Sequence, residues 1–145
     1  CVLFYANFEA RQFRQSEIST EHLLLALFRE DRRLLETLVP GLTAEWAREE
    51  IENRVPLGKA RFRSKDVPLS ATGKRALAYA TEEAGRLGHK YIDFEHLLFA
   101  LAREKDTLAA QILRGHGFDL ARARVEFAQI APRQRDANQW IRLVT

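Results

Sequence analysis

The spacing of apolar residues along this chain predicts helices. In the segment from Ser70 to Leu87, several apolar residues have the spacing of one face of an α-helix, namely Ala71, Leu77, Ala80, Ala84 and Leu87. Ser70 is a suitable N-cap for this helix, and Gly88 is a suitable residue for its end. The corresponding segment near the start of the chain ends at Phe13, and we expect its first residues to lie before Cys1.

Two stretches, HLLLALF and HLLFALA, are apolar on almost every side. A helix of this composition is expected at the centre of a fold, where its neighbours bury it. Ser19 and Asp93 precede the two stretches at equivalent positions and are suitable N-caps. Glu21 and Glu95 then fall in the first helical turn, where the helix dipole stabilises a carboxylate.

Each central helix is followed by a shorter apolar segment and then by a fourth helix. Turn-forming residues separate the two in both halves of the chain. The separating residues are Pro40, Gly41, Gly115, His116 and Gly117. Thr43 and Asp119 are suitable N-caps for the two fourth helices.

The second half of the chain repeats the first. At an offset of 74 positions, 13 of the 29 residues from Ala6 to Leu34 are identical to residues of the second half. A two-residue insertion then moves the offset to 76, so that Gly41 corresponds to Gly117. Because helical periodicity runs through both copies, we predict an all-α fold: two four-helix repeats that share a core and form a pseudo-twofold single globular domain.

We expect the first repeat to span residues 1–55 and the second residues 70–131. Residues 56–69 contain two prolines, a glycine and four basic residues, which favours an exposed, largely irregular linker. The basic residues and Phe62 could contact RNA or DNA, but a solvated linker is the preferred interpretation. The basic residues are Lys59, Arg61, Arg63 and Lys65. The tail, residues 132–145, either docks on the domain through apolar residues such as Trp140 or leads into further chain.

Composition narrows the class of protein. At 145 residues the chain fits one domain, and the lack of any methionine suggests a fragment of a longer product. A net charge of +3 argues against a dedicated nucleic-acid-binding protein, and no apolar run is long enough for a membrane span. One cysteine cannot form an internal disulfide, which fits a cytoplasmic protein.

The sequence lacks the common signatures of an enzyme. There is no phosphate-binding GxxxxGK[ST] loop, no HExxH and no Cys/His cluster with zinc spacing, so we expect no catalysis, cofactor or metal. His22 and His96 are expected to pack or to cap their helices, because a neighbouring glutamate points about 100° away on a helix. His89 and His116 are expected to be solvated, and no partner residue identifies Cys1 as a nucleophile.

Glu21 and Glu95 allow two interpretations. Each can be a first-turn carboxylate that only stabilises its helix. Alternatively, each can lie at a groove and accept paired hydrogen bonds from a guanidinium group. Two such sites in one domain would favour a ligand with two basic groups.

The chain resembles the Clp amino-terminal repeat domain in its doubled EHLL-AL-RE pattern. The resemblance extends to the residues before the second copy, LSATGKRALAYATEEAGRLGHKYIDFEH, and to those after it, AAQILRGHGFDLARAR. The Clp amino-terminal repeat domain is the N-domain of ClpC- and ClpA-type ATP-driven unfoldases, and the resemblance covers Phe4 to Ala131. It implies two four-helix repeats and a non-catalytic role in docking protein substrates or adaptor proteins. The alternative is a stand-alone double-repeat protein without a motor that binds a Clp unfoldase or peptidase ring and regulates it.

The resemblance also implies candidate site residues for phosphoarginine. The glutamates of the EH pattern, Glu21 and Glu95, correspond to those that receive the guanidinium group. Counting back from Glu95 within the second repeat, Ser70 and Lys74 correspond to the residues that assist with the phosphate, at a helix N-terminus suited to an anion. The equivalent positions for Glu21 would lie before Cys1, so we expect the first site to be incomplete.

Overall fold

The structure, a computed structural model, describes residues 1–128 and contains eight α-helices within them. The helices of the first repeat are α1 (Val2–Gln12), α2 (Thr20–Glu30), α3 (Arg32–Leu38) and α4 (Ala44–Arg54). Those of the second repeat are α5 (Ala71–Arg86), α6 (Phe94–Arg103), α7 (Leu108–Gly115) and α8 (Leu120–Ala128). The predicted behaviour of the tail concerns residues outside the described part of the chain.

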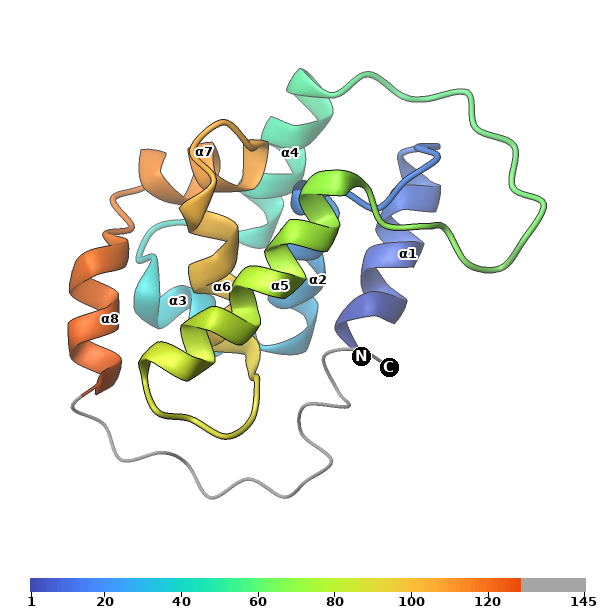
Figure 1. Cartoon of the computed structure of the whole chain (residues 1–145). Coiled ribbons are helices and arrows are strands. Elements are labelled where there is room, and N and C mark those ends of the chain that lie inside the picture. The colour runs from blue at the N-terminus through green and yellow to red at the C-terminus, as the bar shows by residue number, and fades with distance from the viewer. Residues whose placement is uncertain (129–145) are drawn as a thin grey trace.

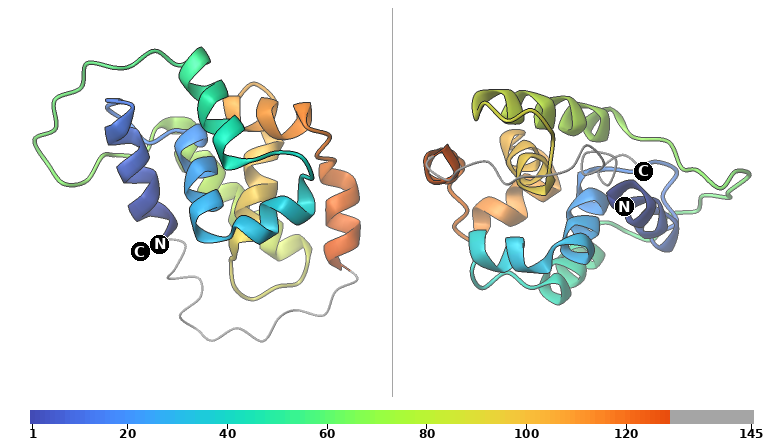
Figure 2. Two further views of the ribbon diagram at one scale, coloured as in Figure 1. Left: turned by 180° about the vertical axis from the view of Figure 1, so that it is seen from behind. Right: turned by 90° about the horizontal axis from the view of Figure 1, so that it is seen from below.

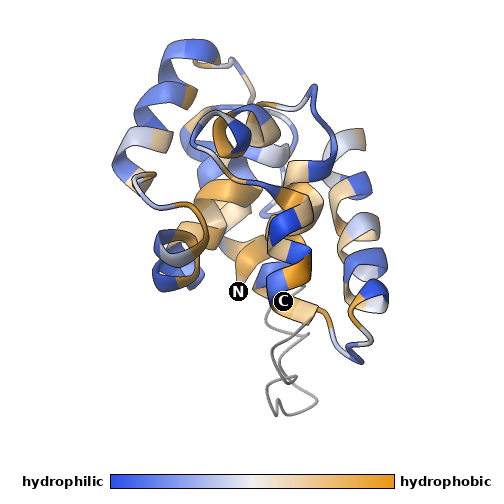
Figure 3. Cartoon of the chain, turned by 90° about the vertical axis from the view of Figure 1, so that its left-hand side faces the viewer, coloured by the Kyte–Doolittle hydropathy of each residue, from blue (hydrophilic) through white to orange (hydrophobic). Residues whose placement is uncertain are grey.

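The two repeats share one hydrophobic core. Helices α2 and α6 lie at its centre and contact each other, and each is covered by the other helices of its own repeat (Figures 1 and 2). Apolar residues of both repeats belong to the same buried cluster, from Val2 in α1 to Ala123 in α8. The prediction of an all-α fold built from two four-helix repeats is therefore confirmed. Along the outer helices, polar and apolar residues alternate turn by turn, as Figure 3 shows.

The predicted N-caps all begin helices. Oγ1 of Thr43 accepts a hydrogen bond from the backbone N–H of Trp46 at 3.0 Å, and Oγ of Ser70 accepts one from Gly73 at 3.1 Å. Oδ1 of Asp119 does the same at the start of α8. These bonds satisfy N–H groups that have no partner inside the helix.

The first helix of each repeat ends in the same way. After α5, the N–H groups of Gly88 and His89 return to the carbonyls of Gly85 and Ala84, and Gly88 has a φ of +69°. This is the Schellman arrangement, which needs a residue in the left-handed region. After α1 the equivalent position is occupied by Arg14, with a φ of +54°. The same turn is therefore made by a residue with a side chain, at some conformational cost.

The linker, residues 56–69, is irregular as predicted, but the expectation that it is exposed is only partly right. It arches outward beyond the helices and returns along α1 (Figures 1 and 2). Val67 is buried and Phe62 is half-buried. The linker docks because polar groups of α1 satisfy its backbone: the Asn7 side chain bonds to both Lys65 and Val67.

No helix in the described part of the chain is long and apolar enough to cross a membrane.

The core contains two charged residues at equivalent positions of the two repeats. Glu9 in α1 and Glu83 in α5 are both buried. Each pairs with an arginine of the fourth helix of its own repeat, Arg48 in α4 and Arg124 in α8. These pairs tie the first helix of each repeat to the last.

Candidate functional site

Both central helices begin with a histidine that caps them. Nδ1 of His22 accepts a hydrogen bond from the backbone N–H of Ser19 at 2.9 Å, and Nδ1 of His96 accepts one from Asp93 at 2.7 Å. The predicted packing or capping role of these histidines is thus confirmed. Burial lowers the pKa of each imidazole to about 4, so both rings are neutral near pH 7.

The second ring nitrogen distinguishes the two repeats. Nε2 of His96 lies 2.8 Å from Nδ1 of His89, whereas the buried Nε2 of His22 has no hydrogen-bond partner. Gln15 occupies the position that matches His89, and its amide bonds to the linker carbonyl of Pro56 instead. The expectation that His89 is solvated is therefore wrong, because its ring satisfies a buried polar atom of His96.

His116 is also not a solvated side chain. Its ring packs edge-on against Trp46 with 4.2 Å between ring centroids, and its Nδ1 lies 3.0 Å from the carbonyl of Ile112. This contact joins the end of α7 to α4 of the other repeat. The expectation was wrong because a helix end was treated as a surface, although the second repeat presents this end to the first.

Three potential metal ligands gather at the start of α6. The ligand atoms of His89, Glu95 and His96 lie within 4.8 Å of one another, although the sequence analysis expected Glu95 and His96 to diverge. They approach because the His96 ring turns back to cap the helix. That cap also opposes a metal ion: Nδ1 accepts the Asp93 N–H, which places the ring proton on Nε2, the atom that a metal would need. The two histidines form a hydrogen-bonded pair instead.

The two candidate glutamates lie at equivalent positions in the first turns of α2 and α6. Glu21 is half-buried, and burial raises the pKa of its carboxyl group. Hydrogen bonds from its own backbone and from Thr20 oppose this effect only in part. Glu95 is buried, with 5% of its surface exposed. Glu21 is thus the more accessible of the two carboxylates.

Ser70 and Lys74 belong to the second repeat, but the start of α5, where they lie, is beside the start of α2 in the first repeat. The backbone N–H of Ser70 donates to the carbonyl of Ile18 at 2.9 Å, and Ile18 precedes Glu21 by three residues. Ile18 and Leu69 form an isolated parallel bridge. The N-terminus of α5 is therefore fixed against the segment that leads into α2.

This placement corrects the grouping made from the sequence, which assigned Ser70 and Lys74 to Glu95. Helix α5 has 16 residues, so about 24 Å separates its two ends. Glu95 lies in the first turn of α6, and the loop that leads into α6 leaves the far end of α5 (Figure 1). Counting within one repeat failed because the approximate twofold brings the first helix of the second repeat to the central helix of the first.

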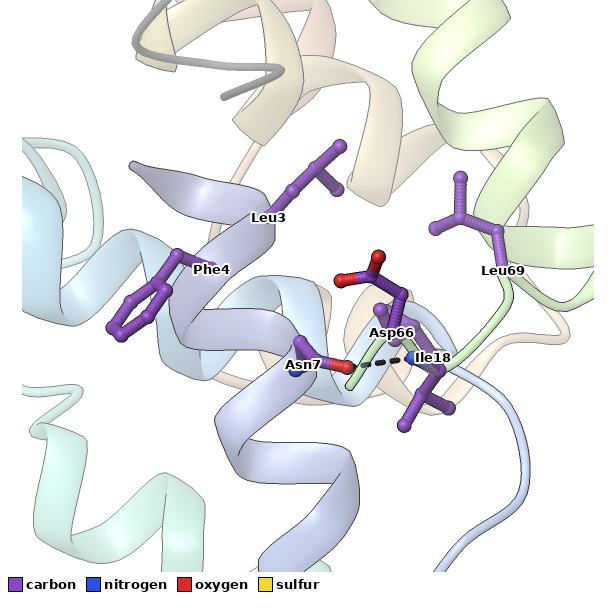
Figure 4. A pocket seen from close by; sticks show the side chains of 7 residues that line it. Leu3, Phe4, Asn7, Ile18, Asp66 and Leu69 are labelled. Carbon is purple, nitrogen blue, oxygen red and sulfur yellow. Dashed lines mark hydrogen bonds between the residues drawn. The ribbon is translucent and has the colours of Figure 1, made fainter. Parts of the chain in front are cut away.

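A pocket of about 370 Å³ opens beside this junction (Figure 4). Its wall includes Ile18 and Leu69, the two residues of the bridge, and its rim includes the exposed carboxylate of Asp66. The remaining lining residues are Leu3, Phe4, Asn7 and Val67. This pocket could not be predicted from the sequence, because it forms where α1 meets the linker and neither segment has a local signal for it.

The pairs of the buried Glu9 with Arg48 and of the buried Glu83 with Arg124 were not predicted from the sequence, although a signal was present. Glu9 matches Glu83 at the offset of 74, and Arg48 matches Arg124 at the offset of 76. Two charged residues of opposite sign that recur in both copies of a repeat indicate a contact made in each copy.

These features define an all-α double-repeat domain whose central helices both begin with a Glu-His pair. The chain matches the Clp repeat (R) N-terminal domain over residues 68–140, about half of its length, and it belongs to that family. The resemblance seen in the sequence is confirmed.

Relatives of known name agree with this assignment. The chain is 32% identical over 139 residues to an ATP-dependent Clp protease ATP-binding subunit, a ClpA homologue of Porphyra purpurea, covering 94% of this chain and 17% of the relative. It is 33% identical over 133 residues to the negative regulator of genetic competence ClpC/MecB of Bacillus subtilis, covering 89% of this chain and 16% of the relative. The chain thus spans about a sixth of the length of these curated relatives.

Two solved structures share the fold. The N-terminal domain of the caseinolytic protease associated chaperone ClpD from Arabidopsis thaliana has a TM-score of 0.69 and 25% identity, covering 88% of this chain and 86% of that domain. A protein studied as part of a malarial protein secretion system has a TM-score of 0.72 and 20% identity, covering 88% of this chain and 90% of that one. The second similarity shows the fold alone.

Proposed function

We propose that this domain is a non-catalytic docking module that receives protein substrates or adaptor proteins for a Clp-type ATP-dependent unfoldase in the cytoplasm. Within this role, phosphoarginine is the group that it recognises. The recognition site is composite: Glu21 comes from the first repeat, and Ser70 and Lys74 come from the second.

One observation carries this proposal, namely the hydrogen bond from the Ser70 N–H to the Ile18 carbonyl at 2.9 Å. It brings a helix N-terminus, which favours an anion, to the segment that leads into Glu21, which favours a cation. A phosphoarginine side chain has both charges, a phosphate on one side and a guanidinium group on the other.

The phosphate side of the site rests on α5, the longest helix of the described chain. The dipole of a 16-residue helix places partial positive charge at its first turn. Lys74 lies in this region with an exposed side chain and adds a full charge. Oγ of Ser70 lies 3.0 Å from Oγ1 of Thr72, so one hydroxyl proton is shared between the two oxygens and the other is available to a phosphate oxygen.

The guanidinium side of the site rests on Glu21. Burial of its carboxylate without a basic partner is unfavourable, which is why its pKa is raised. A guanidinium group that donates two hydrogen bonds would relieve this cost and return the pKa toward its usual value. Binding is therefore favoured by a charge that the free domain leaves poorly compensated.

Calorimetric titration with free phosphoarginine tests the proposal. We expect wild-type binding to be lost in Glu21→Gln and weakened by about tenfold in Lys74→Gln, the effect of about 1.4 kcal/mol. Glu95→Gln is the matched control, because Glu95 is buried and lies in the first turn of the helix that follows the end of α5 opposite to Ser70 and Lys74. It should leave the affinity unchanged.

The outcomes separate the parts of the proposal. Loss of binding in Glu95→Gln with retention in Glu21→Gln would contradict the composite site. No heat with the wild-type domain would reject phosphoarginine as the ligand. Docking itself would be rejected if the unfoldase that contains this domain processed protein substrates equally well after its deletion.

A further inference from the structure

The linker is a positively charged segment of this chain. Residues 56–69 contain four basic residues and one acidic residue, Asp66, so the net charge of the segment is +3. The other residues that the structure describes, 1–55 and 70–128, have 16 basic and 18 acidic side chains. The positive loop is therefore attached to a helical body whose net charge is slightly negative.

Within residues 1–128, most arginines of the helices form ion pairs, whereas the basic residues of the loop do not. Nine arginines of the helices form ion pairs with glutamates in the described part of the chain. No ion pair is formed there by the four basic residues of the loop, and all four are exposed. They are Lys59, Arg61, Arg63 and Lys65. We refer to these four side chains as the basic loop surface.

The backbone beneath this surface is fixed against α1. The Asn7 amide nitrogen donates to the carbonyl of Lys65 at 2.9 Å, and its oxygen accepts from Val67 at 2.7 Å. Arg11 donates to the carbonyl of Ser64 at 3.0 Å, and its guanidinium group lies 4.4 Å from the ring centre of Phe62. These contacts hold the second half of the loop.

The first half of the loop is held by the turn after α1. The N–H groups of Gly58 and Ala60 donate to the carbonyls of Phe13 and Arg14, at 2.9 and 3.1 Å. A loop that is already ordered loses less conformational entropy when a partner binds. The basic loop surface is thus presented on a fixed backbone rather than on a free chain.

Burial alternates along the loop. Ala60 and Phe62 are half-buried, whereas Lys59, Arg61 and Arg63 beside them are exposed. Leu57, just before the first of these cations, is 67% exposed and adds an apolar contact. A protein interface commonly combines an apolar contact with a charged rim.

We propose that the basic loop surface binds an acidic segment of a partner protein. The inference rests on the charge distribution and the docked loop, and it is independent of phosphoarginine recognition. A protein segment fits better than single-stranded nucleic acid, whose bases stack on exposed aromatic rings. Phe62, the aromatic residue of the loop, is covered by Arg11 and offers no such platform.

Fluorescence anisotropy with a labelled oligoglutamate peptide tests the proposal. At low salt, where surface charges are least screened, we expect Arg61→Ser/Arg63→Ser to weaken binding by about tenfold. Lys90→Ser/Lys105→Ser is the matched control, because it removes the same charge from exposed positions of the second repeat. It should change the affinity by less than about twofold. Circular dichroism melts should be unchanged in both variants.

Two results would overturn the proposal. Equal weakening in both variants would mean that the peptide responds to overall charge and not to the loop. Tighter binding of an oligothymidine of equal formal charge at the same salt concentration would mean that the surface selects phosphates. Phosphoarginine binding should be the same in the Arg61→Ser/Arg63→Ser variant and the wild type, which separates this surface from the composite site.

Discussion

The buried Glu83 and the half-buried Arg124 form a bidentate ion pair that joins the first and last helices of the second repeat. The guanidinium group donates from Nε to Oε1 at 2.7 Å and from Nη2 to Oε2 at 3.1 Å. Glu83 is 1% exposed. In the first repeat, Arg48 donates once to Glu9 at 2.6 Å, and the second oxygen of Glu9 has no partner.

Removing Arg124 should therefore destabilise the domain strongly. Arg124→Leu leaves a carboxylate buried without its main partner, and we expect the free energy of unfolding to fall by about 2 to 4 kcal/mol. Arg86, with a nitrogen 3.8 Å from Glu83, limits the loss. Chemical denaturation with urea measures the change.

Two further variants control this prediction. Glu83→Leu/Arg124→Leu also removes the carboxylate that Arg124→Leu leaves buried, and most of the lost stability should return. Arg122→Leu breaks the exposed pair with Glu126 and should cost less than about 1 kcal/mol. A double variant less stable than Arg124→Leu alone would contradict this account.

Arg14 should be replaceable by glycine with a gain in stability. It adopts a φ of +54° at the position that Gly88 occupies in the second repeat. Because a side chain disfavours the left-handed region, we expect Arg14→Gly to raise the free energy of unfolding by about 1 kcal/mol. Gly88→Ala should lower it by a similar amount. Opposite signs in thermal or urea unfolding are the diagnostic result.

Two glycines of α5 should respond to the same substitution in opposite ways. A Cβ at Gly85 would meet nothing within 4 Å, so Gly85→Ala should stabilise the helix by up to about 1 kcal/mol. A Cβ at Gly73 would lie 2.7 Å from the carbonyl oxygen of Ile18. Gly73→Ala should therefore destabilise the domain by about 1 to 3 kcal/mol.

The Gly73 variant also addresses the junction between the repeats. Ile18 and Ser70 are hydrogen-bonded there, so a Cβ at Gly73 should move the two residues apart. We expect Gly73→Ala to weaken phosphoarginine binding even at a temperature at which the variant is still folded. Gly85→Ala is the control for both measurements. Unchanged stability in Gly73→Ala would show that the two repeats are not in close contact at this point.

Acid should destabilise the domain through its two capping histidines. Their pKa is about 4 in the folded domain and about 6.5 in the unfolded chain, so the unfolded chain binds more protons in this interval. The stability that the neutral histidines contribute is therefore fully present above pH 6.5, and it is lost as the pH falls toward 4. Each histidine contributes on the order of 2 to 3 kcal/mol to this loss.

The histidine effect can be isolated by substitution. Glutamine at the third helical position also reaches back to the N-cap, so His22→Gln/His96→Gln should keep the caps and flatten the pH dependence. Glu21 acts with the opposite sign, because its raised pKa makes stability fall as the pH rises above 4.5. The contribution of Glu21 is the same in the wild type and in the double variant, so it cancels when the pH dependence of one is subtracted from that of the other. An unchanged slope in the double variant would contradict the assignment.

Local features of the fold could be predicted from the sequence because they depend on neighbouring residues. Ser70 and Thr43 precede helices that they cap, and the apolar stretches after Ser19 and Asp93 form the buried central helices. The repeat also gave the architecture, since two similar units with one apolar face each must bury those faces against each other.

The arrangement of the site could not be predicted in the same way. Ser70 meets the start of α2 only because the repeats pack about an approximate twofold, which an offset along the chain does not reveal. The polar partners of His89 and of the linker are likewise distant in sequence: Asn7 and Val67 are 60 positions apart. Proline indicated that the linker is irregular, but not that α1 would satisfy its backbone.

Because the basic loop surface lies outside the core, the loop and the helices are free to change at different rates. A substitution in the helices must respect packing and buried pairs, whereas the exposed side chains of residues 59–65 can change sign without disturbing either. Substitution of a few exposed residues can thus change the class of partner that the domain binds while the fold stays the same. Exchanging only the exposed side chains at positions 59, 61, 63 and 65 between Clp repeat domains should transfer partner preference while leaving the melting temperature of the recipient unaltered.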